Sequence, residues 1–166
     1  RFWNSTSLEP KRQHRWTLSL GNNLVSYAVK TSDKPSFTIN ETEHSYFGHK
    51  FYYPGSVTWN EITVTFVDPI SPDISGALMN LLRKSGYQAP DVASINKPQI
   101  PTISKENAVL NSAILTQYSS AKATGQASEV EKWDLKNAWI KDVKFGSLDY
   151  GSDDLVEVEV TIKYDW

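Results

Sequence analysis

The last twelve residues of the chain, LVEVEVTIKYDW at 155–166, alternate apolar and polar side chains almost without a break. Successive side chains of an extended strand point to opposite faces, so this pattern predicts a half-buried β-strand. One face carries the apolar side chains of Val156, Val158, Val160, Ile162 and Tyr164. The strand is either an edge that another subunit covers, because a bare edge invites aggregation, or a central strand of the subunit's own sheet. Alternation identifies faces and not edges, so both interpretations remain open.

Other segments repeat this pattern or break it with turn residues. Residues 14–20 alternate, Gly21-Asn22-Asn23 is a turn signal, and 24–30 can return as a hairpin partner. Residues 57–67 form a second strong strand, and two further strand signals follow. They lie at 113–120 and, as a long hairpin containing WDLKNAW, at 129–145.

Only one segment has helical spacing. Its apolar stripe comprises Ile74, Ala77, Leu78, Leu81 and Leu82. Ser71 as N-cap, Pro72 at the first helical position and Gly86 as the stop predict a helix over 71–86. Residues 1–12 are expected to form a polar arm, and 87–108 a proline-containing loop. The whole indicates one domain, 1–166, that is mainly β: two packed antiparallel sheets, as a sandwich or barrel, with one flanking α-helix.

The stretch TEHSYFGHKFYYPGS at 42–56 has neither helical nor strand periodicity and is predicted to be a loop. It holds the rings of Tyr46, Phe47, Phe51, Tyr52 and Tyr53. A loop with this many rings either folds back on the core or packs on another chain.

Several classes of function are disfavoured by composition. The chain has no cysteine and three histidines, which leaves few options for a nucleophile with its base. His44 and His49 lie near Glu41 and Glu43, but the spacing matches no metal-ligand pattern. We therefore expect no enzymatic activity, no catalytic residue, no metal and no cofactor. A net charge of -2 gives no sign of a DNA-gripping face, and we expect neither a transmembrane helix nor a signal peptide.

The order of these segments resembles a known family. In the predicted strand at 57–67, Trp59 comes first and TVTF follows. After it come one helix, a strand with ILTQYSS, the hairpin with WDLKNAW and the end Tyr164-Asp165-Trp166. Together they resemble the tail tube protein of contractile-tailed, T-even-like bacteriophages, and FWNSTSLEPKRQHRW suggests a marine or cyanobacterial branch. The resemblance covers most of the chain, most clearly 57–85 and 113–166. No single motif is diagnostic.

The resemblance implies a structural protein without catalysis. It implies hexameric rings, in which sheets of neighbouring subunits join into one barrel, stacked into a tube that conducts DNA without binding it specifically. The implied partners are further copies of the chain, the tail sheath, the tape measure protein and baseplate tube proteins, with no membrane. The implied location is the virion, assembled in the bacterial cytoplasm.

Four groups of residues receive expected roles. The loop 42–56 is expected to contact the next ring through Tyr46, Phe47, Tyr52 and Tyr53. Lys11, Arg12 and Arg15 either bind acidic groups of a neighbouring subunit or form a solvated patch, and Trp166 packs on a neighbour or on the helix. The lumen candidates are Glu157, Glu159, Lys163 and Asp134, because acidic or neutral polar side chains would keep DNA mobile. Mixed charges there suit subunit salt bridges equally well.

Two alternatives accompany this interpretation. The proline-rich stretch 87–107 departs from the family pattern. It is either an outward loop that faces the sheath or the mark of a baseplate protein of the same fold that initiates the tube. A different class is a carbohydrate-binding β-sandwich, in which Trp3, Tyr53 and Trp166 would stack on sugar rings.

Overall fold

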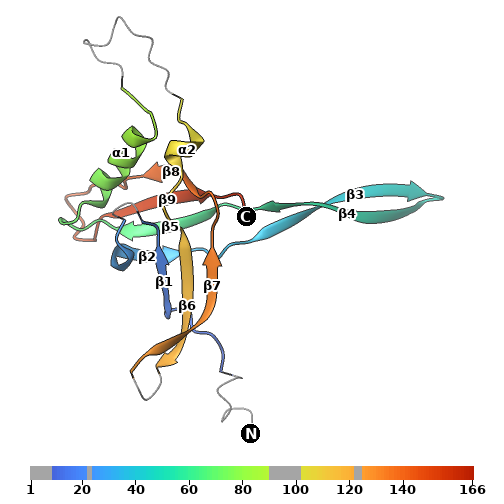
Figure 1. Cartoon of the computed structure of the whole chain (residues 1–166), viewed down its shortest axis with the longest axis horizontal. Helices are drawn as coiled ribbons and strands as arrows, with labels where there is room; N and C mark the ends of the chain where they lie inside the picture. The colour runs from blue at the N-terminus through green and yellow to red at the C-terminus, as the bar shows by residue number, and fades with distance from the viewer. Residues whose placement is uncertain (1–8, 22–23, 90–101, 122–124) are drawn as a thin grey trace, which may run out of the picture.

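A computed structural model describes residues 9–21, 24–89, 102–121 and 125–166. Its strands form three antiparallel sheets, in the orders β1-β6-β7, β2-β5-β9-β8 and β3-β4 (Figure 1). The first contains Trp16–Ser19 (β1), Ile114–Ala121 (β6) and Ala127–Asp134 (β7). The second contains Val29–Ser32 (β2), Ile62–Val67 (β5), Glu157–Lys163 (β9) and Trp139–Lys144 (β8). The expected mainly β architecture of two packed sheets with a flanking helix is confirmed, and a projecting two-stranded sheet is added to it.

One hydrophobic core joins the first two sheets and the helix. Leu18 and Leu115 come from the three-stranded sheet, whereas Phe66 and Val160 come from the four-stranded sheet and are completely buried. Alternation explains this burial, because every second residue of β5 and β9 points inward. The two strands pair antiparallel with Val64 opposite Val160, so their apolar faces coincide.

The C-terminal strand β9 is central. It lies between β5 and β8, and both neighbours belong to the same chain. The interpretation of 155–166 as an edge that needs another subunit was therefore wrong, and the alternative of a central strand holds. The edges of this sheet are β2 and β8, which the sequence pattern could not identify because alternation is the same for central and edge strands.

The helix α1 spans Ile74–Lys84 and is shorter than expected. Its N-cap is Asp73 and not Ser71. The side chain of Asp68 accepts hydrogen bonds from the Ile74 amide (3.1 Å) and the Ser75 hydroxyl (2.6 Å), so a carboxylate earlier in the chain fixes the first turn. Ile74 and Leu78 are buried, and Ala77 and Leu81 pack beside them, as the stripe predicted.

Two predicted hairpins were wrong. Residues 24–30 do not pair with β1: Ser26–Ala28 form a 3-10 helix (η3), and β2 pairs with β5. β1 pairs instead with β6. Likewise β7 and β8 belong to different sheets, because the connection between them carries Leu135 and Ala138 into the core.

A short helix, α2 (Lys105–Ala108), lies inside the expected loop 87–108, of which residues 90–101 fall outside the described residues.

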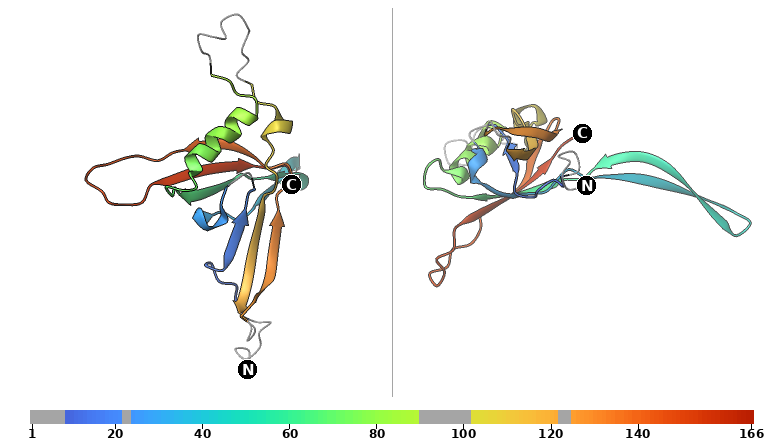
Figure 2. Two further views of the ribbon diagram at one scale, coloured as in Figure 1. Left: turned by 60° about the vertical axis from the view of Figure 1, so that its left-hand side comes forward. Right: turned by 90° about the horizontal axis from the view of Figure 1, so that it is seen from below.

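The segment 42–56 is a β-hairpin and not a loop. Phe37–Tyr46 (β3) and His49–Trp59 (β4) pair along their length and project far from the body (Figures 1 and 2). Both faces are exposed almost throughout, so no hydrophobic alternation marks the strands. The two-residue turn, Phe47-Gly48, has positive φ at both positions, 47° and 75°, which is the geometry of a tight hairpin turn.

Candidate assembly surfaces

The β3-β4 hairpin carries the residues expected at the inter-ring contact. Tyr46, Phe47, Tyr52 and Tyr53 are all exposed, and Phe47 is 85% exposed at the tip. Tyr52 and Tyr53 are adjacent on one strand, so they present rings on opposite faces. The structure therefore gathers the four residues on one arm that contains an exposed apolar surface on both sides.

The base of the hairpin is held by aromatic rings. Phe37 meets Trp59 edge-on, with ring centroids 5.5 Å apart, and Trp59 lies 6.2 Å from Tyr164 of the segment after β9. The Asn60 amide donates to the Ser36 carbonyl (2.9 Å). Buried Tyr164 thus connects the hairpin to the core. The only sequence signal for this contact is the alternation that predicts a buried Tyr164.

The basic residues expected at a subunit interface bind groups of their own chain. Lys11 donates to Glu131, and the Arg15 guanidinium donates to the Ser120 hydroxyl (2.8 Å) and to Glu9 (3.4 Å). The backbone carbonyl of Arg12 accepts from the Gln117 side chain (3.1 Å). Residues 9–15 therefore lie along β6 and β7.

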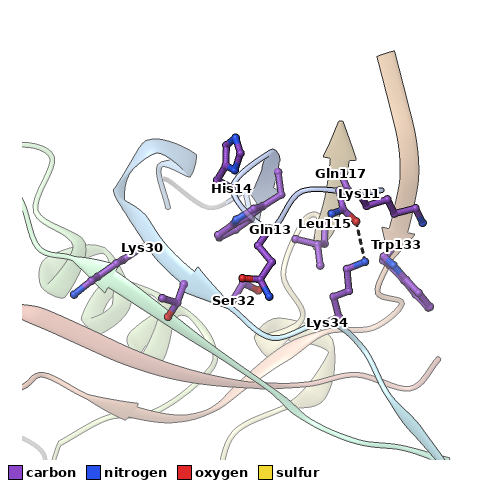
Figure 3. Close-up of a pocket in the computed structure, with 11 residues that line it drawn as sticks. Lys11, Gln13, His14, Lys30, Ser32, Lys34, Leu115, Gln117 and Trp133 are labelled. Atoms are coloured by element: carbon purple, nitrogen blue, oxygen red, sulfur yellow. Dashed lines mark hydrogen bonds between the residues drawn. The ribbon is translucent and has the colours of Figure 1, made fainter. Parts of the chain in front are cut away.

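Glu131 accepts hydrogen bonds from three residues, Lys11, Lys34 and Trp133, which line a pocket between the three-stranded and four-stranded sheets (Figure 3). Hydrogen bonds from Lys11, Trp133 and Lys34 lower the pKa of Glu131 to about 2, because each of these donors favours the charged carboxylate. Figure 3 shows Lys34, whose ammonium also donates to the Gln117 side-chain oxygen (2.8 Å). The pocket is therefore lined by cations that already have carboxylate or amide partners.

The C-terminal residue Trp166 is 63% exposed. Its carbonyl accepts from the Lys136 amide (2.9 Å), and the Asp165 amide donates to the Lys136 carbonyl (3.0 Å). Asp165 also accepts from Lys105 (2.7 Å) and from the Asn137 side chain (2.9 Å), and these bonds lower its pKa. The backbone of the terminus is fixed, and the indole is left open to solvent.

Three of the four lumen candidates share one face of one strand. Glu157, Glu159 and Lys163 alternate with the buried residues of β9 and point away from the core. Glu157 pairs with Lys30 of β2, and Glu159 lies 3.9 Å from Lys144 of β8, so carboxylates and ammonium groups of the same sheet compensate one another. Asp134 lies at the end of β7 in the other sheet and pairs with Lys136.

No catalytic arrangement was expected, and none of the described residues form a group of three or more side chains with metal-ligand chemistry. Neither helix that the structure describes is long and apolar enough to span a bilayer. The expectations of no enzymatic activity and no cofactor remain predictions. Of the residues suggested for sugar binding, Tyr53 lies on the hairpin and Trp166 at the terminus, whereas Trp3 falls outside the described residues.

Comparison with known proteins gives structural neighbours only: no protein-family model and no curated protein matches the sequence. A chain in the six-fold symmetrised baseplate of the anti-feeding prophage has a TM-score of 0.66 at 17% identity, over 95% of this chain and 93% of that chain. A chain in the tube-terminating cap of the same prophage has a TM-score of 0.64 at 15% identity, over 95% and 88%.

A third neighbour is a chain in the extended sheath–tube complex of an extracellular contractile injection system, PVC. It has a TM-score of 0.60 at 17% identity, over 97% of this chain and 91% of that chain. At these identities the likeness concerns the fold, and it extends over nearly the whole described structure. The chain therefore has a fold that occurs in baseplate, cap and sheath–tube structures of contractile injection systems.

Proposed function

We propose that this protein is a structural subunit of the tube in a contractile tail or injection particle, where copies form hexameric rings that stack inside a sheath. The observation that carries this proposal is the fold likeness over 95–97% of the chain to components of such particles, one of them six-fold symmetrised. The exposed aromatic hairpin adds support, because an arm of this kind needs a partner outside its own subunit.

The outer face of the four-stranded sheet fits the proposed lumen. Glu157, Glu159 and Lys163 lie there, and paired opposite charges leave little net field to hold a polyanion. A bore of this kind lets DNA pass without specific binding. The proposed partners are the sheath, the tape measure protein and baseplate tube proteins. Membership of a T-even-like, marine phage, virion location and assembly in the bacterial cytoplasm remain predictions.

A second candidate is a baseplate or cap subunit of the same fold. It is supported by the fold likeness to chains in baseplate and cap structures, with TM-scores of 0.66 and 0.64. A tube subunit stacks on both of its faces, whereas an initiator or cap stacks on one.

Negative-stain electron microscopy of the concentrated protein, with its mass in solution, tests the proposal. Six-fold rings that stack into hollow tubes support a tube subunit, and rings that stop at one or two layers support the baseplate or cap candidate. A monomer at every concentration that also fails to extend a purified baseplate template contradicts both. A glycan array then tests the sugar-binding alternative.

The double variant Tyr52→Asp/Tyr53→Asp identifies the stacking element. We expect folded subunits whose rings do not stack, because charges replace rings on both faces of the arm. The matched control is Thr38→Asp/Thr58→Asp, which places the same two charges on a cross-strand pair at the base of the hairpin. Tubes of unchanged length in the tyrosine variant would exclude the hairpin from the interface.

A further inference from the structure

The hairpin tip has an unusual residue at its turn. Phe47 is the first of the two turn residues and has φ of 47°, in the left-handed region. Asn, Asp or Gly is favoured at this position, and a bulky side chain there is an outlier. The Phe47 ring meets Tyr46 edge-on at 4.5 Å but otherwise projects into solvent. The chain therefore accepts backbone strain at a point where the ring contributes nothing to its own core, which points to a contact outside the subunit.

A groove suited to such a ring lies between α1, α2 and β8. It has a volume of about 690 Å³, within the range of sites that enclose a small ligand. Its apolar wall includes Met79, Leu82, Ile103, Trp139, Val143 and Phe145. Five consecutive residues of β8, 139–143, line it, and consecutive residues alternate faces, so the groove runs along the edge of this outermost strand. Trp139, at the start of β8, forms a bridge with Val109; beyond it the edge strand offers backbone groups that suit an extended partner rather than a helix.

The hairpin tip lies far from the groove of its own subunit. The groove reaches the base of the hairpin, because Lys163 and Asp165 line it and the Lys163 ammonium donates to the Trp59 carbonyl (3.3 Å). From that base the hairpin projects away from the body (Figure 1). A head-to-tail arrangement, in which the arm of one copy enters the groove of the next, uses both surfaces and repeats from copy to copy.

The charged groups around the groove are mostly paired within the subunit. Lys105 pairs with Asp165 and Lys141 pairs with Glu61. On the hairpin, Glu43 pairs with Lys50. A contact between the hairpin tip and the groove therefore depends on the apolar ring and the apolar wall rather than on net charge.

We propose that the groove between α1, α2 and β8 receives the hairpin tip of a second copy, with Phe47 as the inserted ring. This inference deepens the proposed function and rests on it, since it names the surface that receives the arm when subunits stack. It assigns roles to Phe47, to the apolar wall and to the free edge of β8.

Crosslinking between single-cysteine variants tests the contact, and the native chain contributes no cysteine of its own. His49→Cys lies beside the tip and leaves Phe47 in place, and Asp142→Cys lies on the groove. A mixture of the two, treated with a short bismaleimide, should give crosslinked dimers at least tenfold above a mixture of His49→Cys with Ser26→Cys, an exposed position on η3.

A second substitution removes the aromatic ring of Phe47 without disturbing the fold of the hairpin. Phe47→Asn places a favoured residue in the left-handed turn, so the hairpin should remain intact and the melting temperature should not fall. In that background the crosslink should decrease at least tenfold, whereas Phe47→Tyr should preserve it. A crosslink unchanged by Phe47→Asn would overturn the role of the ring.

Microscopy of the same samples distinguishes failure of this inference from failure of the proposed function. If rings or tubes form but the crosslink between His49→Cys and Asp142→Cys is not enriched, the groove does not receive the hairpin. The proposed tube function would then still hold. Neither particles nor the crosslink at the highest soluble concentration would overturn both. Particles with the crosslink, and loss of both in Phe47→Asn, are the expected result.

Discussion

Strand β9 and the β3-β4 hairpin are both regular antiparallel structure, yet they are stabilised in different ways. β9 has a neighbour on each side and a core beneath it, with Val158, Val160 and Ile162 fully buried. The hairpin has only its own two strands, and nearly all of its side chains are exposed. A two-stranded ribbon is marginal in water. The body therefore has a hydrophobic core of its own, whereas the hairpin has none within its subunit.

The largest expected effect on stability comes from a substitution in the buried strand β9. Val160→Asp places an unpaired carboxylate in the centre of the core, and we expect a loss of more than about 4 kcal/mol, which prevents cooperative folding. Deleting residues 155–166 should have the same outcome. Circular dichroism and thermal melting measure it, with Glu159→Gln on the solvent face as the control, within about 0.5 kcal/mol of the native chain. A cooperative melt of Val160→Asp would show that β9 is peripheral.

A smaller effect on stability is expected where the three-stranded and four-stranded sheets meet. The pKa of Glu131 falls from 4.5 to about 2 in the fold, so its bonds with Lys11, Trp133 and Lys34 stabilise the protein above about pH 4.5. This contribution decreases as the pH falls from about 4.5 to 2, where the carboxylate becomes protonated. Glu131→Gln should therefore lower stability by about 1 kcal/mol at pH 7.

The measurement for Glu131 is denaturant unfolding at several pH values. The difference between the native chain and Glu131→Gln should become smaller as the pH approaches 2. Glu129→Gln is the control, because Glu129 lies on the same strand and the structure shows no ion pair for it among the described residues. A difference that does not change between pH 7 and pH 2 would contradict the assigned cause.

The smallest effect on stability is expected from shortening the hairpin. Residues 40–56 can be replaced by Asn-Gly, which joins the paired residues Ile39 and Val57 through a favoured two-residue turn. We expect the free energy of unfolding to change by less than about 1 kcal/mol, since few core contacts are lost and a shorter connection costs less chain entropy. Ring stacking should nevertheless be abolished. A large loss of stability would show that the arm is part of the fold.

The sequence predicted the body better than the arm for a physical reason. Alternation in 57–67 and 155–166 arises because one face is buried, so these strands and the stripe of α1 were identified correctly. The same signal cannot specify partners: it placed 24–30 beside β1 and joined β7 to β8, although neither pair exists. In 42–56 both faces meet solvent, and the period-two signal therefore disappears even though the backbone is extended.

For the candidate assembly surfaces, the sequence predicted a set of residues but not how they are arranged. The rings of 42–56 were expected either to fold back on the core or to pack on another chain, and the structure shows Tyr46, Phe47, Tyr52 and Tyr53 exposed together on one arm. The turn at Phe47-Gly48 could have been recognised from its glycine, but a phenylalanine at the first position is not a typical hairpin signal. The groove beside β8 depends on residues from α1, α2 and β8 that only the fold brings together.

The attachment of the arm also has a mechanical consequence. β4 ends at Trp59 and β5 begins at Ile62, and Figure 1 shows the two strands following one another along the length of the molecule. A pull on the hairpin tip is therefore transmitted through two residues into β5. There the load acts along a ladder of hydrogen bonds to β9, which must break together rather than one after another. The arm is therefore joined by a short linkage to the strand pair that contains the fully buried residues Phe66 and Val160.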